Sequence, residues 1–132
     1  MKQVFNPIKD KSATIIETIM NAPEMTTDED LLFKIRLAVE EVVENVVRYA
    51  YIQGNGWLEV STERLNRSLV IVLRDAGKPF NPLAKEDPDI TLSVEDRPIG
   101  GLGIFLCKKL MDDVSYKYEN DCNVLTIQKE VE

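Results

Sequence analysis

The stretch from Leu37 to Tyr51, LAVEEVVENVVRYAY, limits most strongly how this chain can fold. On a helical wheel at about 100° per residue, the apolar residues of the wider segment 31–51 form one broad arc. They are Leu31, Leu32, Ile35, Ala38, Val39, Val42, Val43, Val46, Val47 and Ala50. Because valine forms helices poorly on its own, such a helix needs an apolar partner layer. The pattern therefore predicts a long helix packed on a core.

The polar residues of this helix fall in two groups. Asn45 lies at the edge of the apolar arc with Glu41 just beyond it, whereas Glu40 and Glu44 point toward solvent. Residues four apart lie on one helix face, so Glu41 and Asn45 can meet one ligand. Taken alone, the pair is more typical of an ordinary polar edge on an amphipathic helix. Alternatively, Asn45 binds magnesium through its amide oxygen, and Glu41 deprotonates or orients a water or hydroxyl.

The N-terminal part of the chain predicts a strand and a helix before the long one. Lys2–Phe5 is a short strand, and Ile8–Met20 shows partly helical apolar spacing. Thr26, followed three residues later by Glu29, matches a capping box that would start the long helix.

The second half of the chain predicts two pairs of strands with a helix between them. Trp57–Arg64 alternates and Leu69–Leu73 is nearly all apolar, so they form a hairpin whose second strand is buried on both faces or close to it. An amphipathic helix follows over Ile104–Met111. Val114–Tyr118 and Val124–Glu130 are the closing strands.

Two glycine-containing stretches border a long segment without periodicity. Asp75 and Gly77 follow a strand, where they can form a turn or present a carboxylate to an exocyclic amine. The segment 81–99 is acidic and has the length of a lid or a binding loop. The run 100–103, Gly-Gly-Leu-Gly, then opens a helix, where it is either a tight turn or an anion site made by unpaired N–H groups. It does not match a dinucleotide fingerprint, and no GxxxxGK[ST] loop occurs.

Length and composition restrict the class of protein. The 132 residues, 44% hydrophobic and 30% charged, are typical of one folded domain spanning 1–132. A net charge of −7 disfavours nucleic-acid binding. No apolar run approaches the roughly 20 residues of a membrane helix, and the N-terminus lacks a signal-peptide core. Cys107 and Cys122 lack metal-site spacing and are typical of a reducing cytoplasm.

The chain contains no histidine. This excludes Ser-His-Asp and Cys-His catalysis and most zinc sites. A general base must then be a carboxylate or a lysine. A metal would be held by hard oxygen donors, which favours magnesium or calcium.

Three stretches in this order resemble the GHKL ATPases, the superfamily of gyrase, heat-shock chaperone, histidine-kinase and mismatch-repair ATPase domains. Glu41-x-x-x-Asn45 resembles the helix box that carries the catalytic carboxylate and the magnesium-binding asparagine. The two glycine stretches resemble the boxes that contact the adenine amine and the phosphates. The nucleotide-binding residues implied by this resemblance are Asp75, Gly77, Pro79, Phe80, Gly100, Gly101, Leu102, Gly103 and Ile104.

Within that superfamily the chain most resembles the bacterial anti-sigma-factor serine/threonine kinases. The segments AVEEVVENVVRYAY and GGLGIFLCKKLMDDVSY are similar in sequence to the corresponding segments of that subgroup. The resemblance implies an α+β fold, a two-layer sandwich with helices on one face of a mixed, mainly antiparallel sheet. It also implies binding of ATP with Mg2+, phosphorylation of a small anti-anti-sigma protein, sequestration of a sigma factor, and by analogy a homodimer.

Two positions depart from the family pattern. Tyr49 stands where the family often has histidine, and Cys122-Asn123 replaces a common Gly-Thr near the adenine, so that Asn123 becomes a candidate contact at that end. Since there is no phosphoacceptor histidine, a complete sensor histidine kinase is excluded. Two alternatives stay open: a partner-trapping ATP-binding module without phosphotransfer, and a stand-alone histidine-kinase-like ATPase domain.

Overall fold

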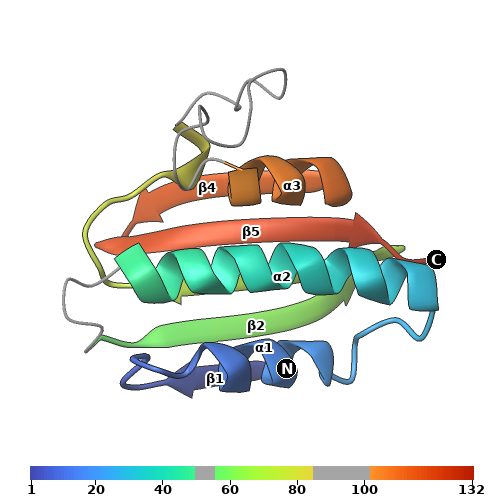
Figure 1. Ribbon diagram of the computed structural model, residues 1–132, viewed down its shortest axis with the longest axis horizontal. Coiled ribbons are helices and arrows are strands. Elements are labelled where there is room, and N and C mark those ends of the chain that lie inside the picture. Colours follow the sequence, from blue (N-terminus) through green and yellow to red (C-terminus); the bar gives the residue numbers. More distant parts are fainter. Residues whose placement is uncertain (50–55, 85–101) are drawn as a thin grey trace.

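The computed structural model describes residues 1–49, 56–84 and 102–132, which form two layers, a β-sheet and a set of helices on one of its faces (Figure 1). In chain order the elements are β1 (Lys2–Phe5), α1 (Ser12–Met20), α2 (Glu29–Tyr49), β2 (Leu58–Leu65), β3 (Ser68–Asp75), the short 3-10 helix η1 (Pro82–Ala84), α3 (Leu102–Leu110), β4 (Asp113–Glu119) and β5 (Cys122–Glu130). The α+β two-layer prediction is confirmed. In this part of the chain, no helix is long and apolar enough to cross a membrane.

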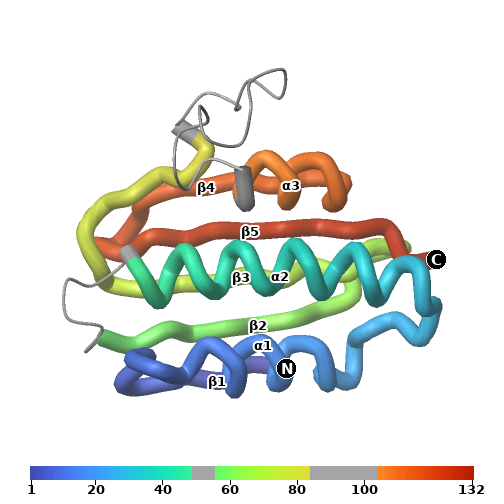
Figure 2. The backbone as a smooth tube through the Cα atoms, in the orientation of Figure 1, coloured from blue at the N-terminus to red at the C-terminus, as the bar shows by residue number. Residues whose placement is uncertain are grey.

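The sheet has the strand order β1-β2-β3-β5-β4, and every pairing between its strands is antiparallel. The parallel component of a mixed sheet is therefore absent from the described strands. The tube in Figure 2 shows α2 running across the middle of the sheet, with α1 on the β1 side and α3 on the β4 side. This arrangement places the carboxyl end of α2 near the loop that follows β3.

The core lies between α2 and the central strands. Val39, Val42 and Val43 of α2 are fully buried, as is Ile71 at the centre of β3. Each such side chain gains about 1.5–3 kcal/mol on leaving water, which outweighs the low helix propensity of valine. The apolar arc predicted for the long helix is the face that packs on the sheet.

The beginning of the first helix differs from the sequence prediction. The helix begins at Ser12 rather than at Ile8, because the N–H of Ile8 bonds the carbonyl of Gly56 (3.0 Å). The N–H of Lys11 bonds the carbonyl of Ile8 (3.0 Å), and Asp10 has a φ of 60°. This turn docks the fully buried Ile8 into the core ahead of the helix. A contact with a residue so distant in the chain leaves no trace in the local pattern.

The predicted cap of the long helix is also wrong by two residues. Asp28, rather than Thr26, accepts the N–H of Leu31 on its carboxylate (3.0 Å), and its carbonyl accepts the N–H of Leu32 (2.8 Å). Thr26 accepts the N–H of Asp28 on its hydroxyl (3.1 Å), which shapes the turn before the helix. An aspartate caps as well as a threonine does, and its charge suits the helix N-terminus.

Strand β3 is buried on one face only. Leu69, Ile71 and Leu73 lie under the helices, whereas Val70 and Val72 are half-buried on the opposite face. The predicted burial on both faces, or close to it, is therefore complete on one face, and the other face is half-buried. An unbroken apolar run does not show which of its faces a second layer will cover.

Candidate functional site

A pocket opens between the second half of α2 and the neighbouring ends of β3 and β5. It contains about 370 Å³ of space that is partly open to solvent. Its lining residues are Val42, Asn45, Val46, Leu73, Asp75, Phe80, Pro82, Tyr116, Asn123 and Leu125. Apolar walls with a few convergent polar groups are typical of small-molecule sites.

Asp75 is the acidic group of this pocket. It ends β3, is 3% exposed, and lies opposite Asn123 in the β3–β5 register. Its Oδ1 accepts the N–H of Gly77 (2.8 Å) and the side-chain amide of Asn123 (3.0 Å). Burial raises the pKa of Asp75 above its ordinary 3.8, while these two hydrogen bonds act in the opposite direction. The side chain can therefore accept a hydrogen bond from a ligand N–H group in an apolar setting.

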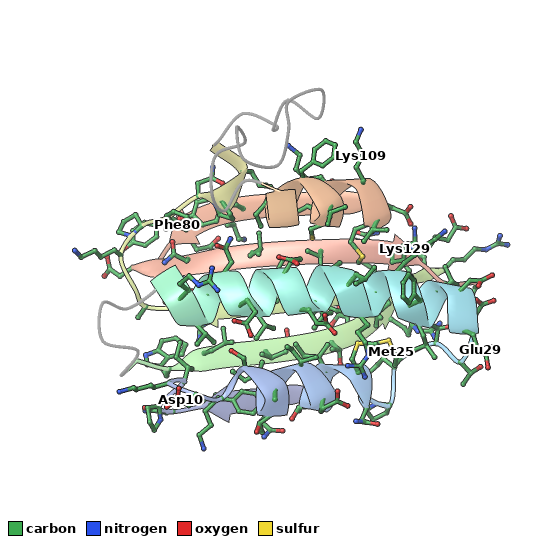
Figure 3. All side chains as sticks on the ribbon, viewed as in Figure 1. Asp10, Met25, Glu29, Phe80, Lys109 and Lys129 are labelled. Carbon is green, nitrogen blue, oxygen red and sulfur yellow. The ribbon has the colours of Figure 1, made fainter. Side chains whose placement is uncertain are left out.

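The bond from Gly77 to Asp75 closes an Asx-turn directly after the strand. The turn leads the chain through the exposed Pro79 to Phe80, which is half-buried and lines the pocket. In Figure 3, Phe80 lies at the end of the molecule opposite to Glu29, the first residue of α2. The pocket is thus at the carboxyl end of this helix.

Glu41 and Asn45 lie one turn apart on α2, at the border that the helical wheel predicts. Asn45 is half-buried and lines the pocket. Glu41 is half-buried and faces α3, where its charge adds to the effect of burial in raising the pKa of Cys107 to about 12. Glu44 is exposed.

Glu40 points to the other side of α2. Its carboxylate lies 3.8 Å from Arg36, which also pairs with Glu17 of α1 at 2.7 Å. Two adjacent glutamates therefore face opposite neighbours: Glu40 faces the α1 side and Glu41 faces α3.

A metal ion at this site would rely on few protein ligands. Among the residues that the structure describes, no group of three or more His, Cys, Asp or Glu side chains could hold a metal. The amide oxygen of Asn45 is a hard donor in the pocket wall and suits magnesium, an ion that commonly takes one or two protein ligands plus phosphate oxygens and water. These residues fit magnesium that arrives with a phosphorylated ligand.

The second glycine stretch is only partly described. Gly100 and Gly101 lie outside the described residues, as does most of the predicted loop 81–99. Leu102 and Gly103 are the first two residues of α3, so the run does open a helix. The side chain of Ile104 is buried in the core. A phosphate contact by Ile104 could therefore involve only its backbone.

The pocket brings together four of the residues predicted from the sequence: Asn45, Asp75, Phe80 and Asn123. It also contains Tyr116 of β4, which the sequence reading missed; its hydroxyl donates to Oδ1 of Asn123. The sequence could have indicated Tyr116 through its place on the last two strands, which are predicted as a pair. Pairing brings residues of one face of two strands together.

Comparison with known proteins identifies the family of the chain. A family model described as the histidine kinase-like ATPase domain matches residues 10–129. The chain is 31% identical over 125 residues to the serine-protein kinase RsbW of Bacillus cereus, covering 90% of this chain and 78% of that protein. The protein of the same name from Bacillus anthracis gives the same values.

Solved structures share the fold. The nucleotide-free catalytic domain of the histidine kinase ThkA superposes with a TM-score of 0.59 at 19% identity, covering 99% of this chain and 97% of that one. The Acinetobacter baumannii histidine kinase AdeS gives a TM-score of 0.55 at 16% identity, covering 100% of this chain and 68% of that one. At sequence identities this low, the similarity to these structures shows only a shared fold. With the family model spanning nearly the whole chain, this protein belongs to the histidine kinase-like ATPase domain family, the GHKL type.

Proposed function

We propose that this chain is an ATP-dependent serine/threonine-protein kinase of the anti-sigma-factor type, which phosphorylates a small anti-anti-sigma protein and sequesters a sigma factor. The observation that carries the proposal is the pocket, in which Asn45 and Asp75 face one space. The likeness to proteins named serine-protein kinases supports the choice of a hydroxyl as the phosphate acceptor. A cytoplasmic location and a homodimer are parts of the same proposal.

ATP would enter this pocket with its adenine first. The exocyclic amine would donate to Asp75, and the ring would pack on Val46, Phe80 and Leu125, which line the pocket. The phosphates would then extend along α2 past Asn45 toward the start of α3. The N–H groups at that helix start favour anions.

Phosphoryl transfer needs a base for the acceptor hydroxyl. Glu41 would take the hydroxyl proton of the substrate serine or threonine while the hydroxyl oxygen bonds the γ-phosphorus. The bond between the γ-phosphorus and the β–γ bridging oxygen would break, and ADP would leave. Asn45 would hold magnesium, which when bound offsets the negative charge of the phosphates. The remaining catalysis is positioning and electrostatic stabilisation.

The test is transfer of labelled γ-phosphate from ATP to a purified anti-anti-sigma protein from the same organism. Glu41→Gln should cut the transfer rate by about 10²–10⁴-fold while ATP binding persists, because a general base contributes that much. Glu44→Gln, an exposed acid on the same helix, is the matched control and should leave the rate unchanged. Full activity of Glu41→Gln, or no transfer by the wild type, would refute the proposed kinase activity.

A second candidate is an ATP-binding module that traps a partner without transferring phosphate. It is favoured by one observation: Glu41 is not among the described residues that line the pocket. In that case Glu41→Gln and the wild type would bind ATP equally, and neither would transfer phosphate. A stand-alone ATPase domain of histidine-kinase type would instead transfer phosphate to a histidine on a separate protein. Acid treatment distinguishes the two products, because phosphohistidine is hydrolysed in acid and phosphoserine is not.

A further inference from the structure

Asn123 is the centre of a buried hydrogen-bond network beside the proposed adenine site. It is the second residue of β5, is 6% exposed, and lies directly opposite Asp75 across the β3–β5 ladder. Its side chain contacts the end of one strand, the loop that follows and a residue of β4. A buried amide at such a junction can hold several segments in one arrangement.

The hydrogen-bonding capacity of the Asn123 side chain is fully used within the protein. Its Nδ2 donates to Oδ1 of Asp75 (3.0 Å) and to the carbonyls of Lys78 (2.9 Å) and Gly77 (3.3 Å). Its Oδ1 accepts the N–H of Phe80 (3.0 Å) and the hydroxyl of Tyr116. An asparagine offers two donor hydrogens and two acceptor lone pairs. No capacity is left for a ligand, so a direct contact with adenine is not the role that this geometry supports.

The network instead controls Asp75. Among the described residues, the hydrogen bonds that Asp75 accepts come from Asn123 and Gly77 and end on its Oδ1, so that in this part of the chain Oδ2 is the oxygen left to a ligand in the pocket. The same two bonds lower the pKa of a carboxyl that burial raises, and they help to keep it an ionised acceptor. Loss of the Asn123 amide would free the carboxylate to rotate and favour its protonated form, which donates rather than accepts.

Tyr116 and the backbone N–H of Phe80 together set which end of the Asn123 amide faces Asp75. The hydroxyl of Tyr116 donates to Oδ1, and the N–H of Phe80 donates to the same atom. Burial raises the pKa of Tyr116 above its usual 10.0, so the phenol remains a donor at neutral pH. With both donors aimed at the oxygen, the amide nitrogen is the end that reaches Asp75.

We propose that Asn123 and Tyr116 are positioning residues that orient the Asp75 carboxylate and thereby make the pocket prefer a purine with an exocyclic amine over one with a 6-oxo group. This inference rests on the proposed ATP site. It assigns the selectivity of that site to two residues that do not bond the ligand's amine themselves.

The test compares the affinities of the purified chain for Mg-ATP and for Mg-inosine triphosphate, which carries a 6-oxo group, by calorimetry. The wild type should prefer ATP by roughly ten- to hundredfold, the range for one hydrogen bond to a charged group. Asn123→Asp is isosteric and places a second carboxylate beside Asp75. The two carboxyls then hold one proton between them, and whenever Asp75 carries it on Oδ2 it donates to the oxo group, so the preference should fall below about threefold. Tyr116→Phe should reduce the preference by about two- to fivefold.

Two variants serve as controls. Tyr118→Phe removes an exposed hydroxyl from the same strand, and Asn21→Asp alters an exposed amide on α1; both should keep the wild-type preference. A merely structural role would lower both affinities and leave their ratio unchanged, so an unchanged ratio in folded Asn123→Asp overturns the inference. If Asn123→Asp does not fold, Tyr116→Phe decides by the same criterion. A wild type that binds neither nucleotide refutes the proposed function, and this inference with it.

Discussion

Asp75→Asn separates binding from folding at the proposed adenine site. An asparagine at position 75 has the shape of the aspartate and can keep its oxygen where Oδ1 now accepts Gly77 (2.8 Å) and Asn123 (3.0 Å). Its NH₂ group then occupies the place of Oδ2, where it opposes the exocyclic amine of ATP. Because the substitution also removes a buried charge, the melting temperature should stay within a few degrees of the wild type.

The size of the binding loss follows from the lost interaction. A hydrogen bond to a charged group contributes about 1.5–3 kcal/mol, and 1.4 kcal/mol corresponds to a factor of ten. ATP affinity should therefore fall by roughly 10–150-fold in Asp75→Asn, measured by isothermal titration calorimetry with magnesium. A folded variant that binds ATP as tightly as the wild type would refute the role of Asp75.

The pH dependence supplies an independent check. Since burial raises the pKa of Asp75 in the folded protein, the cost of burying its charge is present above that raised pKa and disappears as the pH falls through it. The same protonation removes the acceptor, so ATP affinity of the wild type should fall on acidification at a pH above 3.8, the ordinary value. Asp75→Asn should show only the titration of the ATP phosphates. Parallel pH profiles for the two proteins would contradict the reasoning.

Three further predictions concern the fold. Cys107 should resist alkylation by iodoacetamide at pH 8 until denaturant is added, because burial raises its pKa to about 12; peptide mass spectrometry would detect early labelling. Ile71→Ala should lower the free energy of unfolding in urea by about 2–5 kcal/mol, because its side chain is fully buried at the centre of β3. Asp28→Ala should cost about 0.5–2 kcal/mol as a lost helix cap, and more than Thr26→Ala; the reverse order would restore the capping box.

Local pattern was sufficient for most of the fold. The prediction of β1 as Lys2–Phe5 matches the structure, and the hairpin of β2 and β3 turns where expected, with Asn66 at a φ of 57°. The middle of the apolar arc of α2, from Ile35 to Val43, is buried against the core, whereas its described ends, 31–32 and 46–47, are half-buried. These features depend on neighbouring residues, which a sequence displays directly.

The departures from the sequence prediction have a different physical origin. The start of α1 depends on a bond between Ile8 and Gly56, and the one-sided burial of β3 depends on where the helices lie. Both are consequences of contacts between distant parts of the chain. A periodicity argument has no access to such contacts until the topology is known.

The candidate site divides in the same way. Glu41, Asn45 and Asp75 could be singled out because each belongs to a short motif on one element. The contact between Asn123 and Asp75 follows from the antiparallel register of β3 with β5, and Tyr116 joins them through the register of β4 with β5. These residues come from three strands, so only the assembled sheet shows that they form one network.

Folding and ligand binding use some of the same side chains in this domain. Val42 of α2 and Leu73 of β3 are nearly inaccessible core residues, and both also line the pocket. A ligand in the pocket therefore packs on the interface that holds α2 against the sheet, while Asp75 would bind it from the sheet and Asn45 from the helix. Any ligand that contacts both layers binds only when they are docked, so its binding free energy adds to the stability of the folded chain. The apolar helix that most limits the fold is for this reason also one wall of the site.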